Sequence, residues 1–264
     1  MIVCKSPAEL DKMRAANQLV ARILEELAAM VAPGVSTADL DAAAESKVRA
    51  AGAEPAFKGY RGYPATLCAS VNEQVVHGIP NKAPLKAGDI VSLDMGVKLN
   101  GYFGDSAVTV AVGAVREDVS RLLRVTQEAL EKGIAQVKLG GRISDIGHAI
   151  QQHVESQGFW VVREFVGHGI GASLHEEPQI ANYGEPGRGP RLAEGMTLAI
   201  EPMVNMGKPS VKVLGDGWTA VTSDGSLSAH FEHSVAVTSA GPWILTALPV
   251  PSGPAASPAA ENRV

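Results

Sequence analysis

Two acidic segments of the sequence are similar to one another, and this duplication limits the possible folds more than any other feature. Residues 88–97 match residues 195–204, and residues 104–108 match residues 231–235, with glycines, acids and valines in corresponding places. Each copy offers two carboxylates: Asp94 and Asp105 in the first, Glu201 and Glu232 in the second. Four carboxylates at one point repel one another unless a cation lies between them, and oxygen-rich sites with an added histidine suit divalent transition metal ions. The repeat therefore predicts a metal site.

The dipeptide Asn100-Gly101 predicts a β-hairpin that carries the first pair of acids, because it lies between two β-rich runs. A two-residue turn at this dipeptide places Asp94 opposite Ala107. Side chains two positions apart share a face, so Asp105 points to the same side as Asp94 and lies diagonally across from it. A one-residue bulge would turn one of the two acids to the other face.

The duplication extends upstream of the acids. Residues 34–52 and 140–158 share one pattern: a serine or threonine that caps a short helix, apolar residues at helical spacing, and a glycine that closes the helix. The sequence therefore predicts two helix-then-hairpin halves, about 1–113 and 114–248, related by a pseudo-twofold axis.

Two further helices and a tail complete the predicted organisation. A long amphipathic helix starts at Ser6-Pro7, where a capping box precedes a proline in the first helical position, and ends before residues 32–34. A third long helix is predicted from about Glu117 to Val137. The segment 249–264 is rich in Pro, Ala and Ser, which predicts disorder.

Composition favours a cytoplasmic enzyme. A chain of 264 residues with 45% hydrophobic content can bury a single large core, so we expect one catalytic domain over residues 1–248. Cys4 and Cys68 provide no disulfide framework, as a reducing compartment requires. The sequence shows neither a signal peptide nor an apolar run long enough for a bilayer. The net charge of −5 argues against nucleic acid as the main partner, although a local basic patch stays possible.

Three histidines lie in motifs that suggest chemistry. His168 lies between glycines, which permit close approach of backbone or ligand, and beside four duplicated acids it is a candidate metal ligand. His77, in Val-His-Gly-Ile-Pro, follows a predicted strand, and on its own it is more often a loop histidine with no role. His175 lies in Leu-His-Glu-Glu-Pro. His148 and His153 are expected to be ordinary helix histidines.

Most of the other acids are expected to belong to the scaffold. Glu176 and Glu177 are interpreted as surface or turn charges. Asp89, Asp216 and Asp224 each adjoin a glycine and are predicted to stabilise turns.

At this point the residues show a family resemblance. The five candidate ligands in this order and spacing, together with the two motifs that contain His77 and His175, resemble the type I methionine aminopeptidases of bacteria. The match extends to about Val237, with no zinc-binding extension in front and only a short gap between Glu201 and Glu232, where type II enzymes carry a large insertion. The resemblance implies an α+β, pita-bread fold: a curved antiparallel sheet backed by helices.

The resemblance also implies a mechanism. Two divalent ions would be bridged by Asp105 and Glu232, with Asp94 on one ion and His168 and Glu201 on the other. Independently of the resemblance, oxygen-rich ligation with one histidine is compatible with Co, Mn or Fe and is less natural for Zn. A water or hydroxide shared by the ions would be the nucleophile, and Glu201 would also accept the proton. His77 and His175 would contact the scissile amide, with His175 stabilising the developing oxyanion. The free amine of the substrate would be recognised at the metal pair.

The implied substrate is a polypeptide whose N-terminal methionine precedes a small residue. Aromatic rings and sulfur suit a thioether side chain, and the resemblance assigns the pocket walls to Tyr60, Tyr63, Cys68 and Trp218, with His77, Leu174 and His175 also in contact. From the residues alone, without the family resemblance, Tyr60 to Pro64 would be interpreted as a turn with exposed tyrosines. Leu174 replaces an aromatic residue found in many relatives, His230 a common amide, and Val76 a cysteine found in some.

Two alternatives remain open. Prolidase and aminopeptidase P share the fold and similar ligands, but they usually carry a separate N-terminal domain, whereas residues 1–31 form only one predicted helix. A metal-free binding module on the same fold should have lost ligands, yet all five are present. The expected partners are therefore nascent polypeptide N-termini and, transiently, the ribosome, with no nucleic acid substrate and no membrane. A monomer is expected.

Overall fold

The computed structural model describes residues 1–249, and in this part the helices match the predicted pattern closely. They are α1 (Pro7–Met30), α2 (Thr37–Ala50), a short 3₁₀ turn (Tyr60–Gly62), α3 (Glu117–Ile134) and α4 (Ile143–Ser156). The predicted capping box at α1 is confirmed, because Glu9 accepts a hydrogen bond from the backbone N–H of Ser6 at 2.8 Å. Apart from Pro249, the predicted tail lies outside the described residues.

The two short helices of the repeat begin differently. Ser36 caps α2 and accepts a hydrogen bond from the backbone N–H of Asp39 at 3.2 Å, as predicted. The prediction of a Ser or Thr cap is wrong for α4, whose N-cap is Arg142. Asp145 compensates for the missing serine or threonine, because its carboxylate accepts a hydrogen bond from the Arg142 backbone N–H at 2.8 Å. Helix α3 ends three residues before the predicted Val137, since the following residues tighten into i→i−3 hydrogen bonds.

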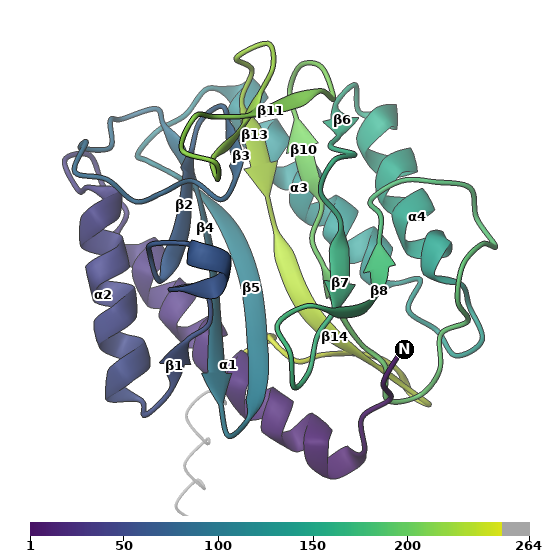
Figure 1. Cartoon of the computed structure of the whole chain (residues 1–264). Helices are drawn as coiled ribbons and strands as arrows, with labels where there is room; N and C mark the ends of the chain where they lie inside the picture. Colours follow the sequence, from purple (N-terminus) through teal and green to yellow (C-terminus); the bar gives the residue numbers. More distant parts are fainter. Residues whose placement is uncertain (250–264) are drawn as a thin grey trace, which may run out of the picture.

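Fifteen strands are described, and all their pairings are antiparallel. The main sheet has the order β1-β4-β5-β14-β9-β7-β8, with β2 beside β4 and β15 beside β14. Two small sheets, β13-β10-β6 and β11-β12-β3, lie at one end of it (Figure 1). The bounds are β1 (Glu54–Pro55), β2 (Leu67–Val71), β3 (Gln74–Val76), β4 (Ile90–Leu99), β5 (Tyr102–Ala111), β6 (Trp160–Val161), β7 (Gly167–Gly169), β8 (Glu176–Ile180), β9 (Thr197–Ile200), β10 (Met203–Asn205), β11 (Val211–Val213), β12 (Ala220–Thr222), β13 (Ser228–His230), β14 (Glu232–Thr238) and β15 (Gly241–Ile244).

The predicted β4–β5 hairpin is confirmed residue by residue. Asn100 and Gly101 form the turn with positive φ angles of 52° and 84°, as a two-residue hairpin turn of this kind requires. Asp94 pairs with Ala107 and the register runs without a shift, so Asp105 lies on the same face as Asp94. The bulge that would have separated the two acids does not occur in this hairpin.

The two halves of the repeat meet where β5 pairs with β14. Only two residue pairs of the register are formed there, Glu232 with Ala107 and His233 with Ser106. Side chains continue the connection: the Ser106 hydroxyl donates to the Glu232 carbonyl at 2.7 Å, and the Ser234 hydroxyl donates to the Asp105 carbonyl at 2.9 Å. We call this contact the seam. It holds the backbones of one acid from each half side by side.

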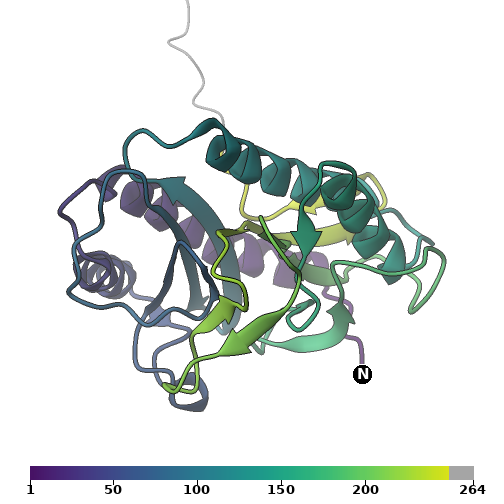
Figure 2. The same cartoon turned by 90° about the horizontal axis from the view of Figure 1, so that it is seen from above.

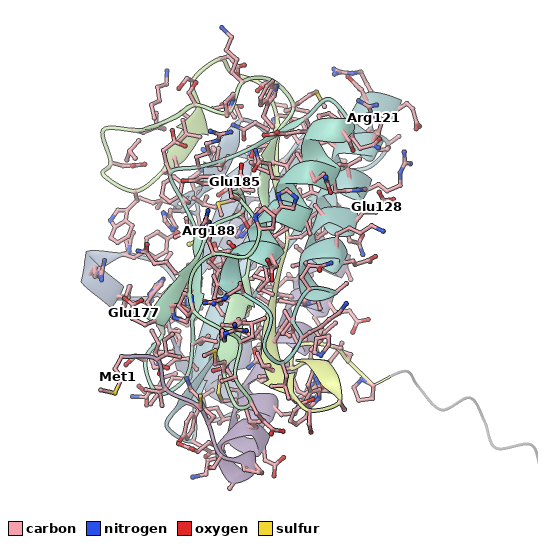
Figure 3. The ribbon with its side chains drawn as sticks, turned by 90° about the vertical axis from the view of Figure 1, so that its right-hand side faces the viewer. Met1, Arg121, Glu128, Glu177, Glu185 and Arg188 are labelled. Atoms are coloured by element: carbon pink, nitrogen blue, oxygen red, sulfur yellow. The ribbon has the colours of Figure 1, made fainter. Side chains whose placement is uncertain are left out.

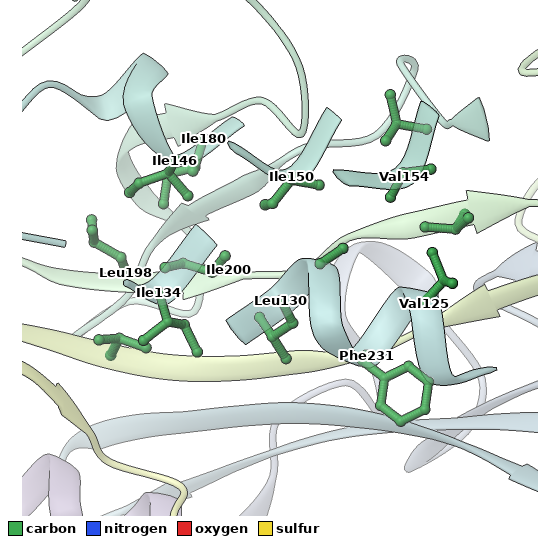
Figure 4. Packing of buried hydrophobic residues seen from close by; sticks show 14 of the residues in the cluster. Val125, Leu130, Ile134, Ile146, Ile150, Val154, Ile180, Leu198, Ile200 and Phe231 are labelled. Atoms are coloured by element: carbon green, nitrogen blue, oxygen red, sulfur yellow. The ribbon is translucent and has the colours of Figure 1, made fainter. Parts of the chain in front are cut away.

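The helices pack on the strands of their own half. Helix α1 lies along β4 and β5, α2 contacts β1 and β2, and α3 and α4 lie over β9, β14, β8 and β6, so that helices cover the outside of the curved sheet (Figure 2). Each half has its own large apolar cluster, and Figure 4 shows the second, in which α3 and α4 face β8, β9 and Phe231. Gly133 permits close packing of these helices, because a Cβ there would lie 2.8 Å from Cδ1 of Ile150.

Several acids and histidines outside the candidate site can be compared with their predicted roles. Asp89, Asp216 and Asp224 accept backbone hydrogen bonds within turns, as predicted. The surface interpretation of Glu176 is wrong, because this residue starts strand β8 and pairs with the buried Lys5. His148 and His153 are ordinary α4 residues hydrogen-bonded to the Gly184 carbonyl and Glu128 respectively.

Among residues 1–249, no helix combines the length and apolar character that crossing a bilayer needs.

Candidate metal centre and adjoining cavity

Five neighbouring strands each deliver one of the five predicted ligands. In the order of the sheet these are Asp94 on β4, Asp105 on β5, Glu232 on β14, Glu201 directly after β9, and His168 on β7. Ligand atoms of Asp105, His168 and Glu232 all lie within 4.8 Å of one another. Nε2 of His168 is 3.6 Å from Oε1 of Glu201, and Asp94 lines the same cavity. The sheet thus brings together acids that are far apart in the sequence.

The buried acids require a positive partner. Burial, reinforced by Asp94 and Glu201, raises the pKa of Asp105 well above its usual range, and burial likewise raises the pKa of Asp94 to about 7. Burial also raises the pKa values of Glu201 and Glu232. Oδ1 of Asp105 and Oε1 of Glu232 are buried without a hydrogen-bond partner among the described residues. Unpaired buried carboxylate oxygens beside an imidazole fit a divalent cation, so the residues present suit a metal centre.

His168 is held so that one ring nitrogen is free for a metal. Its Nδ1 lies 2.8 Å from the carbonyl of Gly169, which requires the proton on Nδ1 and leaves Nε2 pointing at the acids. A Cβ at Gly167 would lie 2.3 Å from the Ala199 carbonyl oxygen, and one at Gly169 would lie 2.3 Å from that of Glu177. The glycines flanking the histidine therefore let three strands approach closely.

The other two histidines flank the acids within the same cavity. The ring centroids of His175 and His168 are 4.2 Å apart, and the hydroxyl of Tyr60 lies 2.9 Å from Nδ1 of His175. His77 adopts a positive φ of 60°, a strained conformation for a residue other than glycine. Burial, with a smaller contribution from His175, lowers the pKa of His77 to about 4, and burial also lowers the pKa of His175. Both imidazoles are therefore neutral near pH 7.

All twelve residues named from the sequence line one cavity of about 180 Å³. Tyr63 is buried and donates its hydroxyl to the carbonyls of Leu67 and Gly78, so its ring is fixed as a wall. Trp218 meets that ring edge-on, with centroids 5.1 Å apart. Burial raises the pKa of the Cys68 thiol, which is therefore neutral. The remaining members of the set are Tyr60, His77, Asp94, Asp105, His168, Leu174, His175, Glu201 and Glu232.

Two lining residues were missed by the sequence analysis. Phe57 and Arg61, which precede and follow Tyr60 in the sequence, also line the cavity. The Arg61 guanidinium lies 5.4 Å from the centre of the Tyr60 ring. An aromatic residue three positions before Tyr60 was the available signal for Phe57, whereas nothing in the turn sequence distinguished Arg61. His230 is buried, and its Nε2 lies 3.8 Å from Oε2 of Glu201.

Comparison with known proteins decides the family. A family model described as metallopeptidase family M24 matches residues 11–239. The chain belongs to this metallopeptidase family. Methionine aminopeptidase 1 of Bacillus subtilis is 55% identical to it over 246 residues, which cover 93% of this chain and 99% of the relative. Methionine aminopeptidase A of Synechocystis is 50% identical over 246 residues, covering 93% and 97%. The resemblance to the type I bacterial enzymes is confirmed.

Solved metallopeptidase structures agree with the fold. Methionine aminopeptidase from Thermotoga maritima aligns with a TM-score of 0.92 and 51% identity, covering 93% of this chain and 99% of that one. Prolidase from Pyrococcus furiosus aligns with a TM-score of 0.75 at 21% identity and shares the fold, but this chain spans only 66% of it. The predicted α+β, pita-bread fold is confirmed. Membership of the family implies divalent metal ions.

The raised carboxyl pKa values predict how the metal-free metallopeptidase responds to pH. Because the folded pKa of Asp94 is about 7 against an ordinary 3.8, the folded state favours its protonated form. That contribution to stability is complete below about pH 4 and is lost as the pH rises through 7. The thermal midpoint of chelator-treated protein should therefore fall between about pH 4.5 and 7. The fall should be shallower in Asp94→Asn, and parallel profiles for the two proteins would contradict the assignment.

Proposed function

We propose that this chain is a methionine aminopeptidase that hydrolyses the peptide bond after an N-terminal methionine, with two divalent ions held by Asp94, Asp105, His168, Glu201 and Glu232. The observation that carries the proposal is the arrangement of these ligands on five neighbouring strands, where they line one cavity together with aromatic rings and a thiol. Oxygen-rich ligation with one imidazole favours Mn, Fe or Co over Zn.

The residues around the acids have separate tasks. When bound, divalent ions lower the pKa of water and polarise a carbonyl, so that hydrolysis proceeds near neutral pH. Glu201, whose Oε1 lies 3.6 Å from Nε2 of His168, accepts the proton released from the attacking water. Neutral His175 donates a hydrogen bond to the developing oxyanion, and neutral His77 contacts the scissile amide. The free N-terminal amine of the substrate would be recognised at the metal ions, which restricts cleavage to chain ends.

The pocket selects methionine by shape and polarizability. Tyr63, Cys68 and Trp218 surround a space suited to an unbranched side chain, and Leu174 closes it from the loop before β8. Tyr60 holds His175 through its hydroxyl and is a further wall. The residue after the methionine lies close to the scissile bond and the histidines, so a large side chain there is excluded.

The biological setting is proposed from the same activity. The substrates are nascent polypeptide N-termini, met in the cytoplasm during transient contact with the ribosome, and the enzyme works as a monomer. Residues 1–248 act as one catalytic domain, because the two halves contribute ligands to the same cavity across the seam.

Peptide cleavage with added metals tests this proposal. The metal-free protein is supplied in turn with Mn, Fe and Co and is assayed on peptides that begin Met-Ala, Met-Leu and Ala-Pro. We expect rapid loss of methionine from the Met-Ala peptide and cleavage of the Met-Leu peptide slower by about 100-fold or more, because a clash at one side chain costs several kcal/mol. Cleavage of Ala-Pro alone would instead identify a proline-specific peptidase, and no cleavage with any metal would support a binding module.

A further inference from the structure

A buried ion pair joins the N-terminal segment to the strand that follows His175. Nζ of Lys5 lies 2.5 Å from Oε2 of Glu176, and the exposed fractions of the two side chains are 3% and 14%. The same Nζ donates to the Val3 carbonyl at 3.1 Å, and the Lys5 backbone N–H donates to the Gly195 carbonyl at 2.7 Å. Met1 and Glu177 accordingly lie at the same edge of the molecule (Figure 3). The segment before α1 is thus fixed beside β8.

The second oxygen of Glu176 organises the loop that precedes it. Oε1 accepts a hydrogen bond from the Ser173 backbone N–H at 3.1 Å. A Cβ at Gly171 would lie 2.5 Å from that oxygen and 2.5 Å from Cε of Lys5, so the loop is folded closely around the ion pair. The loop also carries Leu174 and His175, two residues that line the cavity.

We propose that Lys5 is a positioning residue for His175. It neutralises Glu176, which holds the loop through Ser173 and thereby fixes where the adjoining His175 presents its ring. The proposal rests on the proposed function in one respect, the action of His175 on the substrate. Nothing in it requires Lys5 to touch substrate or metal.

Charge and burial explain why the lysine is needed. Removing one partner of a buried pair leaves an uncompensated charge, so Glu176 would turn toward water and release Ser173. Small displacements of a catalytic group are costly, and a shift of about 1 Å can lower a rate by about 100-fold. His175 and Leu174 would both move with the loop. The acids of the metal centre lie on other strands and would stay in place.

The test compares three variants of the full-length, metal-loaded protein on a Met-Ala peptide. Lys5→Met keeps the length of the side chain but removes the charge. Lys5→Met combined with Glu176→Gln also removes the charge left behind, while keeping an oxygen for Ser173. Lys47→Met is the matched control, because Lys47 pairs with Glu26 on the exposed faces of α1 and α2. Activity per folded molecule, metal content and the imidazole NMR signals of His175 are measured for each.

We expect Lys5→Met to lower kcat by about 10- to 100-fold, with a smaller change in KM because Leu174 moves as well, and with both ions retained and the His175 signals shifted. The double variant should recover at least about 5-fold of the lost kcat, which is within the usual range of coupling between contacting residues. Lys47→Met should behave as the parent. If Lys5→Met does not fold, Glu176→Gln alone provides the comparison.

Two outcomes would overturn the proposal. One is a folded Lys5→Met protein with parental kcat and unshifted His175 signals; the other is a decrease that follows only the fraction of folded protein. Failure of the parent to cleave the Met-Ala peptide would instead count against the proposed function. The NMR comparison still decides the link from Lys5 to His175 in that case.

Discussion

Asp105→Ala and Glu232→Ala should each lower turnover of a Met-Ala peptide by about 1000-fold or more. Each variant removes a carboxylate from within the five-strand cluster, and one oxygen of each carboxylate is buried without a hydrogen-bond partner among the described residues. The loss of several kcal/mol of charge stabilisation corresponds to a factor of this size. Steady-state kinetics with metal analysis of each purified variant measures the effect.

The same variants should behave differently without metal. Deleting one acid relieves repulsion among the remaining carboxylates, so the chelator-treated variant should be at least as stable as the chelator-treated parent. Added metal should then raise the thermal midpoint of the parent far more than that of the variant. Asp11→Ala, on the exposed face of α1, serves as the control. Full turnover with both ions still bound would refute the assignment of Asp105 and Glu232 as metal ligands.

His175→Ala should lower kcat by about 100- to 1000-fold and leave KM nearly unchanged. Removal of one hydrogen-bond donor to a developing oxyanion usually lowers kcat by about this factor. His77→Ala should have an effect of the same kind. Desolvation lowers the pKa of both imidazoles, so both rings are neutral near pH 7, and the His175 ring is held by the Tyr60 hydroxyl.

Metal content distinguishes the alternatives for these histidines. We expect about two ions per chain in both variants, measured by elemental analysis after dialysis. Loss of metal from His175→Ala would make His175 a ligand rather than a transition-state donor. A rise in KM with unchanged kcat would assign the residue to substrate binding alone.

The candidate site was predictable because local rules and the repeat act together. The Asn100-Gly101 turn fixes the register of β4 and β5, and register alone decides that Asp94 and Asp105 share a face. The same reasoning applies to Glu201 and Glu232, because they occupy the corresponding positions in the second copy of the repeat. Glycines flank His168 because the neighbouring strands lie so close to β7 that no side chain would fit at either position.

Other features depend on contacts between distant segments, which no local pattern encodes. Glu176 looked like one of two ordinary acids before a proline, and only its pairing with Lys5 removes it from the surface. Arg142 replaces the expected serine or threonine cap because Asp145 alone can hold the first turn of α4. Arg61 reaches the cavity through a left-handed backbone conformation with φ of 49°, which its residue type does not favour.

The seam between β5 and β14 has a consequence for translation. Translation produces Asp94 and Asp105 before Glu201 and Glu232, because β4 and β5 precede β9 and β14 in the sequence. A chain that ends before β9 carries only two of the four carboxylates, and one that ends before β14 lacks Glu232. We therefore expect hydrolytic competence to begin only once β14 has been synthesised, so chains that end before this strand should not act on other N-termini.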